Sequence, residues 1–262
     1  MSGAVQAIDT GIDSQLKAAV RTYRIKPSFV KAIVLSPVAI VLLYGFAIAF
    51  PPTRSLAFTS LNEGNLIETL TFVFLLLGGI LGLLLTWRTK ERGDEILVVG
   101  FYAMLSIGLL LIAMEEVAWG QKLLWFKTFE TPSALTEINA QDEVTLHNIG
   151  ELQGRSEFFR LAFGLGGLLG VWASSSRRFR KVGVPTILLP WFSIVTILAG
   201  VDLYNDYYPI QAQLDSGLQR LSELVEMMIG ISMLLFVWLN ARRLSFFTNA
   251  KDPSSPSVPT RS

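Results

Sequence analysis

The chain has 262 residues, of which 51% are apolar and only 16% are charged. Soluble globular domains carry about a quarter charged residues, so this composition disfavours a soluble enzyme and excludes a disordered protein or a coiled coil. The chain has no cysteine and a single histidine, His147. Disulfides, thiolate chemistry and any site that needs two imidazoles from one chain are therefore excluded.

Six apolar segments are long enough to cross a bilayer, which takes about 20 mostly apolar residues. They cover residues 29–50, 66–87, 96–118, 157–173, 184–204 and 221–240. The fourth is the shortest, and we expect it to extend at its N-terminal end. The sequence therefore predicts an all-α fold, a six-span transmembrane helical bundle.

The rest of the chain divides into three parts around these spans. Residues 1–27 form an N-terminal segment in which Val5, Ile8, Ile12, Leu16 and Val20 lie at helical spacing, which is typical of an amphipathic helix on the membrane surface. Residues 28–245 form the membrane domain, and we expect its long loop, 119–155, to be ordered because aromatic side chains in it need burial. The tail 246–262 is rich in Pro and Ser and is predicted to be disordered.

The charges predict the orientation. Sixteen of the 22 basic residues fall in segments that a six-span topology places on one side. Basic loops are cytoplasmic, so both termini are predicted to be cytoplasmic, in a cell membrane (the inner membrane in a Gram-negative bacterium). Fifteen of the 21 acidic residues lie on the outer side. The positive-inside rule does not explain this second bias, because acids contribute little to topology.

Glycine and proline residues within the spans carry packing signals. Gly78 and Gly82 are four residues apart, as are Gly166 and Gly170. Small residues at this spacing let membrane helices approach closely, and we favour packing inside the bundle over a dimer interface. Pro37 and Pro190 lie inside predicted spans, where proline kinks a helix.

The acids on the outer side gather at the ends of the spans. At a helix N-terminus the dipole favours an acid, but Glu115, Glu116 and Asp202 lie at C-terminal ends, within or beside apolar sequence. A carboxylate there costs about 2–3 kcal/mol without a partner. Glu226 lies one turn into its span and raises the same problem. Intramembrane acids of this kind are candidate functional residues.

The predicted site combines these acids with the single histidine. Glu143, His147 and Glu151 form one stripe if their segment is helical, and Glu223 and Glu226 share a helix face. The candidate catalytic residues are Glu115, Glu116, His147 and Glu226. The candidate metal ligands are Glu68, Glu116, His147, Glu151, Asp202, Glu223 and Glu226. The candidate substrate-binding residues are Trp119, Gln121, Asn148, Arg155 and Arg160.

Carboxylates with one imidazole suit a single divalent ion such as Mg, Mn, Fe or Zn. We expect the following residues to converge on one centre: Glu115 or Glu116, His147, Asp202, and Glu223 or Glu226.

Two stretches of sequence carry a resemblance. Residues 115–121 read Glu-Glu-Val-Ala-Trp-Gly-Gln, and residues 139–148 read Asn-Ala-Gln-Asp-Glu-Val-Thr-Leu-His-Asn. Together with the acid-rich residues 62–68, they resemble an uncharacterised family of bacterial multi-pass membrane proteins. The resemblance implies a membrane location and a site in this region, and it implies no reaction.

Three functions fit the sequence. The first is a metal-dependent enzyme that acts on a lipid or lipid-linked substrate at the outer membrane face. The second is a cation or proton transporter, because rings of acids collect cations. The third is a non-enzymatic assembly or accessory protein whose outer loop docks a protein partner. In it the acids hold this loop to the bundle by pairing with Arg155, Arg160, Lys122 and Lys127. Membrane lipid is an expected partner in each case and nucleic acid is not, while the sequence leaves the oligomeric state open.

Overall fold

The computed structural model describes residues 14–62, 65–117, 156–208 and 212–244, and within these ranges the chain consists of helices and connecting turns, with no strand. Among the described residues, five helical segments are long and apolar enough to cross a membrane: Pro27–Ala49, Leu66–Glu91, Ile96–Glu116, Thr186–Asn205 and Leu221–Arg243. The protein is therefore all-helical, and its apolar helices are those of an integral, multi-pass membrane protein.

Each predicted span corresponds to a helix. In chain order the helices are α2 (Pro27–Ala49), α3 (Pro51–Ser60), α4 (Leu66–Glu91), α5 (Ile96–Glu116), α8 (Ser156–Ala173), the short 3₁₀ helix η2 (Thr186–Leu188), α9 (Leu189–Tyr207) and α10 (Ala212–Arg243). The predicted fourth span is α8. It has 18 residues, includes Glu157 and Arg160, and is not one of the five segments above, so a sixth span stays a prediction.

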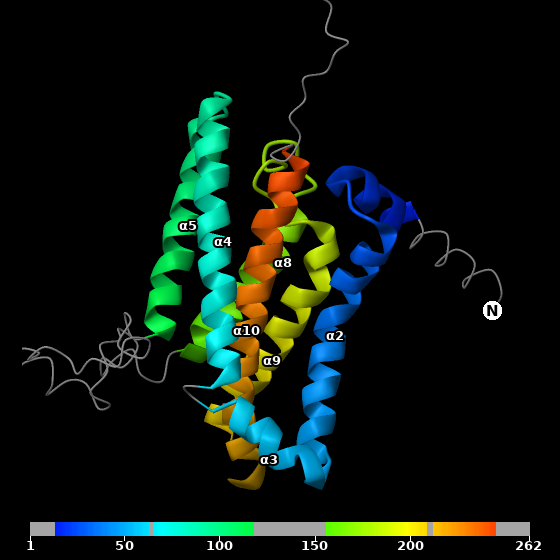
Figure 1. Cartoon of the computed structure of the whole chain (residues 1–262), viewed down its shortest axis with the longest axis vertical. Coiled ribbons are helices and arrows are strands. Elements are labelled where there is room, and N and C mark those ends of the chain that lie inside the picture. The colour runs from blue at the N-terminus through cyan, green and yellow to red at the C-terminus, as the bar shows by residue number, and fades with distance from the viewer. Residues whose placement is uncertain (1–13, 63–64, 118–155, 209–211, 245–262) are drawn as a thin grey trace, which may run out of the picture.

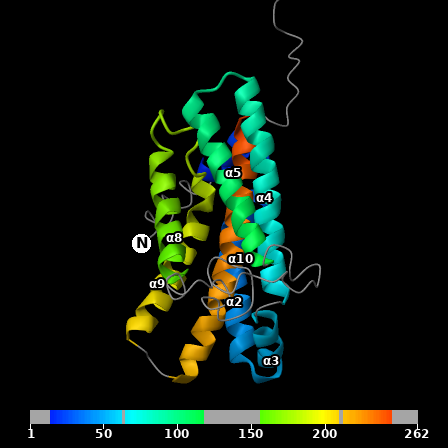
Figure 2. The same ribbon diagram turned by 90° about the vertical axis from the view of Figure 1, so that its left-hand side faces the viewer.

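Helix α10 occupies the centre of the bundle, with α4 on one side and α9 on the other (Figure 1). Helix α5 packs on α4, and α8 packs on α9, so that α5 and α8 flank α10 (Figure 2). Helix α2 lies outside this group against α9 and η2. The core between them includes Leu75, Tyr102, Trp191, Phe192 and Phe236.

The two ends of the bundle differ in charge. The hairpin between α4 and α5, the segment 174–185, the start of α2 and the end of α10 lie at one end, at the top of Figure 1. We call this the basic end, because it holds Arg88, Lys90, Arg92, Arg177, Arg178, Arg180, Lys181, Arg242 and Arg243. The opposite, acidic end holds Glu68, Glu115, Glu116, Glu157, Asp202, Glu223 and Glu226. The helices therefore alternate in direction as the loop charges require, while the side of the membrane that each end faces stays a prediction.

Polar contacts join the segments at the basic end. The Lys181 ammonium donates to Asp94 Oδ1 at 2.7 Å, and the Tyr102 hydroxyl donates to the Lys181 carbonyl at 2.6 Å. The hydrogen bond to Asp94, followed by the charge of Asp94, raises the pKa of Lys181, so this lysine is charged at neutral pH. Arg242 Nε donates to the Tyr23 carbonyl at 2.6 Å, which ties the described part of the N-terminal segment to α10. Residues 14–23 are helical and pack against the bundle through Leu16, Ala19, Val20 and Tyr23.

Proline shapes α2 through the hydrogen bonds that it removes. Pro37 lies inside α2 and has no N–H, so the Ile33 carbonyl one turn earlier lacks its usual helical donor. The buried Trp191 indole donates to this carbonyl at 2.8 Å, and the Ser36 hydroxyl does so at 3.2 Å. Pro190, in contrast, lies in the first turn of α9, where proline leaves the helix intact. The predicted kink at Pro190 is therefore wrong, because α9 begins only one residue earlier.

The glycines pack mainly inside the bundle. A Cβ on Gly78 would lie 3.4 Å from Leu109 on α5, and one on Gly82 would clash with the Ser106 hydroxyl. Gly167 packs against the Phe192 ring, and a Cβ on Gly170 would lie 2.5 Å from Val184. These contacts account for the small residues at these positions without a dimer interface.

Candidate functional site

Arg160 is the centre of a charged cluster at the acidic end. It lies in the second turn of α8, and only 6% of it is exposed. Its guanidinium donates to Glu226 Oε1 of α10 at 3.0 Å, to Glu157 Oε1 of its own helix at 3.0 Å, and to Asp202 Oδ2 of α9 at 3.3 Å. We call these four residues the Arg160 cluster.

The cluster joins three helices and is mostly shielded from solvent. The side chains of Glu157 and Asp202 are 16% and 13% exposed, while that of Glu226 is 30% exposed. Asp202 and Glu226 also lie within two of the five segments that are apolar enough to span a membrane. A single guanidinium thus compensates carboxylates that would be costly in this setting, and three carboxylates share it.

Of the other predicted acids in the described chain, Glu68 lies near the level of Glu226 in the bundle. A Cβ on Gly230 of α10 would lie 3.4 Å from the Thr71 carbonyl of α4. Glu226 and Glu68 each lie about one turn from these residues toward the acidic end. Glu68 is buried in the first turn of α4, and Glu115, Glu116 and Glu223 are half-buried.

The remaining predicted site residues lie outside the described residues. They are Trp119, Gln121, His147, Asn148, Glu151 and Arg155, and with them the predicted ordered loop 119–155 and the tail 246–262. The predicted convergence on His147 therefore stays a prediction. Among the described residues, no group of three or more acidic or histidine side chains is arranged to hold a metal ion. The three acids of the Arg160 cluster are arranged around a guanidinium instead.

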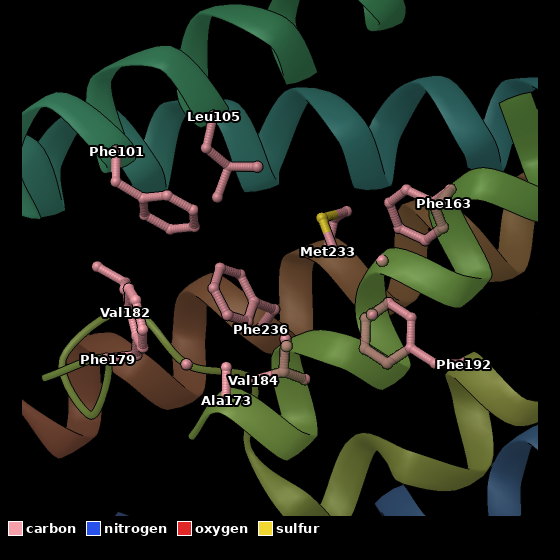
Figure 3. A pocket seen from close by; sticks show the side chains of 14 residues that line it. Phe101, Leu105, Phe163, Ala173, Phe179, Val182, Val184, Phe192, Met233 and Phe236 are labelled. Carbon is pink, nitrogen blue, oxygen red and sulfur yellow. The ribbon is translucent and has the colours of Figure 1, made fainter. Parts of the chain in front are cut away.

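A groove that the sequence does not predict lies between α5 and α8. This groove is a partly open cavity of about 360 Å³ whose walls come from α5, α8, α9, α10 and the segment 179–184 (Figure 3). The lining is apolar: Phe101, Leu105, Phe163, Gly166, Gly167, Gly170, Ala173, Phe179, Val182, Gly183, Val184, Phe192, Met233 and Phe236. We call it the α5–α8 groove.

Glycines of α8 open this groove. Gly167 and Gly170 let α8 approach α9 and the residues before it, where Phe192 and Val184 occupy the space of a side chain. Gly166 also lines the groove, and a Cβ placed on it would have nothing within 4 Å. Close packing of α8 on α9 thus leaves room between α8 and α5. The spacing of Gly166 and Gly170 predicted close helix packing in this region. The sequence does not reveal which of the glycines faces open space.

The two ends of the groove have different surroundings. Phe163 lies one turn along α8 from Arg160, so the groove begins beside the Arg160 cluster. At the other end, Phe179 belongs to the basic segment 174–185 and lies between Arg178 and Arg180. The α8 part of the lining, from Phe163 to Ala173, is about 15 Å long at about 1.5 Å per residue.

Comparison with known proteins leaves the fold and the site to be interpreted from their own geometry. No protein-family model matches the chain, and no curated protein or solved structure gives a significant match.

Proposed function

We propose that this protein is a six-span integral membrane protein that binds a lipid or lipid-linked molecule, whose acyl chain lies in the α5–α8 groove. One observation carries the proposal: an apolar cavity of about 360 Å³ lies between α8 and the helices α5, α9 and α10, which belong to segments that are apolar enough to cross a membrane. Ligand pockets have volumes of about 300–1,000 Å³ and mostly apolar walls.

The chemistry of the lining supports an acyl chain as the occupant. Its aromatic and aliphatic side chains, such as Phe101, Leu105 and Met233, offer an acyl chain dispersion contacts. Water is a poor occupant, because it needs two to four polar partners in such a space. In a membrane, lipid chains are the apolar molecules present in excess.

The sixth span is part of the proposal, and the Arg160 cluster supports it. Helix α8 packs along α9, and its two charged residues, Glu157 and Arg160, pair with each other. Asp202 and Glu226 extend this pairing to two neighbouring helices. Paired charges make insertion less costly than isolated ones, which is consistent with α8 crossing the membrane as predicted.

The groove can be tested by filling it. Gly166→Leu places a side chain in the open space beside Gly166. Gly108→Leu is the matched control, because Gly108 on α5 also has nothing within 4 Å of its Cβ and does not line the groove. The full chain, reconstituted in lipid nanodiscs, is irradiated with a phospholipid that carries a diazirine on its acyl chain, and labelled peptides are identified by mass spectrometry.

We expect labelling of groove residues such as Leu105 and Phe163 in the wild type and in Gly108→Leu. Labelling of these residues should fall several-fold in Gly166→Leu. Equal labelling of the groove in all three proteins would contradict the proposal. So would crosslinking of the groove to another part of the chain or to a second copy, when a photoreactive residue replaces Leu105.

A second candidate is the metal-dependent enzyme predicted from the sequence, for which no group of three or more acids among the described residues is arranged to hold the ion. Metal analysis of the purified protein tests this candidate. A stoichiometric divalent ion that is lost in Glu226→Gln supports it, and a metal content unchanged by Glu226→Gln argues against a site at the cluster. The transporter and accessory-protein alternatives stay predictions.

A further inference from the structure

We infer that the lipid in the α5–α8 groove is an anionic phospholipid of the leaflet at the basic end. Its phosphate lies against the basic segment 174–185, and its acyl chain runs along the groove toward the Arg160 cluster. This inference rests on the proposed function, and it adds the class of lipid, its leaflet and its direction.

The length of the groove fits one leaflet. The α8 lining from Phe163 to Ala173 extends for about 15 Å. The hydrocarbon core of a bilayer is about 30 Å thick, so each leaflet contributes about 15 Å. A chain that enters at Phe179 therefore reaches Phe163 near the middle of the membrane.

The basic end of the groove is suited to a phosphate. Phe179, Val182 and Gly183 of the segment 174–185 form its wall there. Arg177, Arg178 and Arg180 of the same segment are exposed, and the Arg178 guanidinium lies 5.8 Å from the centre of the Phe179 ring. Guanidinium groups bind phosphate oxygens in pairs, and basic residues beside a membrane select anionic lipids. Lys181 is already bound to Asp94, so the three arginines form the proposed headgroup site.

The opposite end of the groove is less suited to a phosphate. There the Arg160 guanidinium is already hydrogen bonded to Glu157, Asp202 and Glu226. An anionic group brought to this end would compete with three carboxylates for this guanidinium, whereas the arginines of the segment 174–185 are exposed. The charges at the two ends therefore fix one direction for an anionic lipid. The ester and phosphate of this lipid lie away from the carboxylates, so it is a resident ligand and not a substrate of the Arg160 cluster.

The experiment compares two probes that share one acyl chain. Phosphatidylglycerol and phosphatidylcholine, each with a diazirine on the chain, are added separately to the full-length protein in phosphatidylcholine nanodiscs. We expect phosphatidylglycerol to label groove residues more strongly, by about fivefold for each arginine that contacts its headgroup. A diazirine near the end of the chain should label the region of Phe163. A diazirine near the carbonyl should label the region of Phe179.

Two variants test whether the preference for phosphatidylglycerol depends on the three arginines or on the total charge of the basic end. The triple variant Arg177→Gln, Arg178→Gln, Arg180→Gln should remove the preference for phosphatidylglycerol and leave phosphatidylcholine labelling unchanged. The control, Arg88→Gln with Lys90→Gln, removes charge from the other loop of the basic end, and it should retain the preference.

Each other outcome overturns the inference in a distinguishable way. If both probes label the groove equally and Gly166→Leu blocks both, the proposed function stands and the choice of an anionic headgroup is wrong. If the chain-end diazirine labels Phe179 and the carbonyl-proximal one labels Phe163, the direction is wrong. If neither probe labels the groove, the proposed function fails as well.

Discussion

The guanidinium of Arg160 takes part in three ion pairs, and each of them reaches a different carboxylate inside the bundle. Without it, Glu157, Asp202 and Glu226 would repel one another where water is scarce. We therefore expect Arg160→Leu to lower the stability of the protein by about 3–5 kcal/mol, the usual cost of breaking a buried pair from one side. Thermal unfolding in detergent measures this loss.

Two further variants test the cause of that loss. Arg160→Lys keeps the charge but not the planar fork of donors, so its unfolding temperature should lie between those of the wild type and Arg160→Leu. Adding Glu226→Gln to Arg160→Leu should recover part of the stability, because it removes one of the repelling charges. An Arg160→Leu protein that unfolds at the wild-type temperature would show that the cluster contributes nothing to stability.

Asn240 is a buried polar side chain whose removal should raise the stability of the protein. It is fully buried near the basic end of α10, and within the described chain neither its Nδ2 nor its Oδ1 has a hydrogen-bond partner. An unsatisfied buried polar group costs about 1–3 kcal/mol. Asn240→Leu, which has nearly the same shape, should therefore raise the unfolding temperature by several degrees. A lower temperature would mean that the amide has a role that packing does not explain.

At the scale of elements, neighbouring glycines of α8 should respond differently to the same change. Gly167 packs against the Phe192 ring of α9, so the methyl group of Gly167→Ala forces the two helices apart. Overpacking of this kind costs about 1–3 kcal/mol. Gly166→Ala adds its methyl group to open space and gains the better helix propensity of alanine. We expect the first variant to unfold at a lower temperature than the wild type and the second at an equal or higher one; the reverse order would contradict the assigned helix face.

The sequence predicted the long apolar helices but not the short helix α3. The apolar runs predicted the long helices, because burial in lipid depends on composition alone. The sequence did not predict α3 (Pro51–Ser60), whose residues are largely polar. There the side chains of Thr53 and Arg54 donate to the Ala47 and Ile48 carbonyls at 2.9 and 2.8 Å, which the prolines at 51 and 52 leave without helical donors.

The candidate site was predictable only in part. The energetic cost of an acid in a span singled out Asp202 and Glu226, and the accessory-protein alternative named Arg160 among four possible basic partners, but the sequence did not show which acids Arg160 joins. Arg160 is 42 residues from Asp202 and 66 from Glu226, and sequence separation contains no information on such a contact. The α5–α8 groove depends on the spacing between two helices that do not follow each other in the described chain. Its residues therefore looked like ordinary core.

For the whole molecule, the orientation in the membrane is the next quantity to measure. The chain has no cysteine, so single cysteines can be introduced without other changes. Ser176→Cys lies at the basic end and Ser55→Cys, in α3, lies at the other end, and both positions are exposed. In intact cells, an impermeant thiol reagent should label Ser55→Cys only, whereas in inverted membrane vesicles it should label Ser176→Cys. Labelling of both variants from the same side would contradict the topology.

The hydrogen bond from Trp191 to the Ile33 carbonyl also has a consequence for synthesis of the chain. Its two partners are 158 residues apart, an interval that a ribosome takes about 8–32 s to translate at about 5–20 residues per second. During that time α2 is already made, but its packing surface on α9 and η2 does not yet exist. Helix α2 has a high apolar content and only three buried residues in the finished bundle, so it can be surrounded by lipid until α9 is present. Helix α2, which is translated before α9, is thus among the last helices to complete its packing.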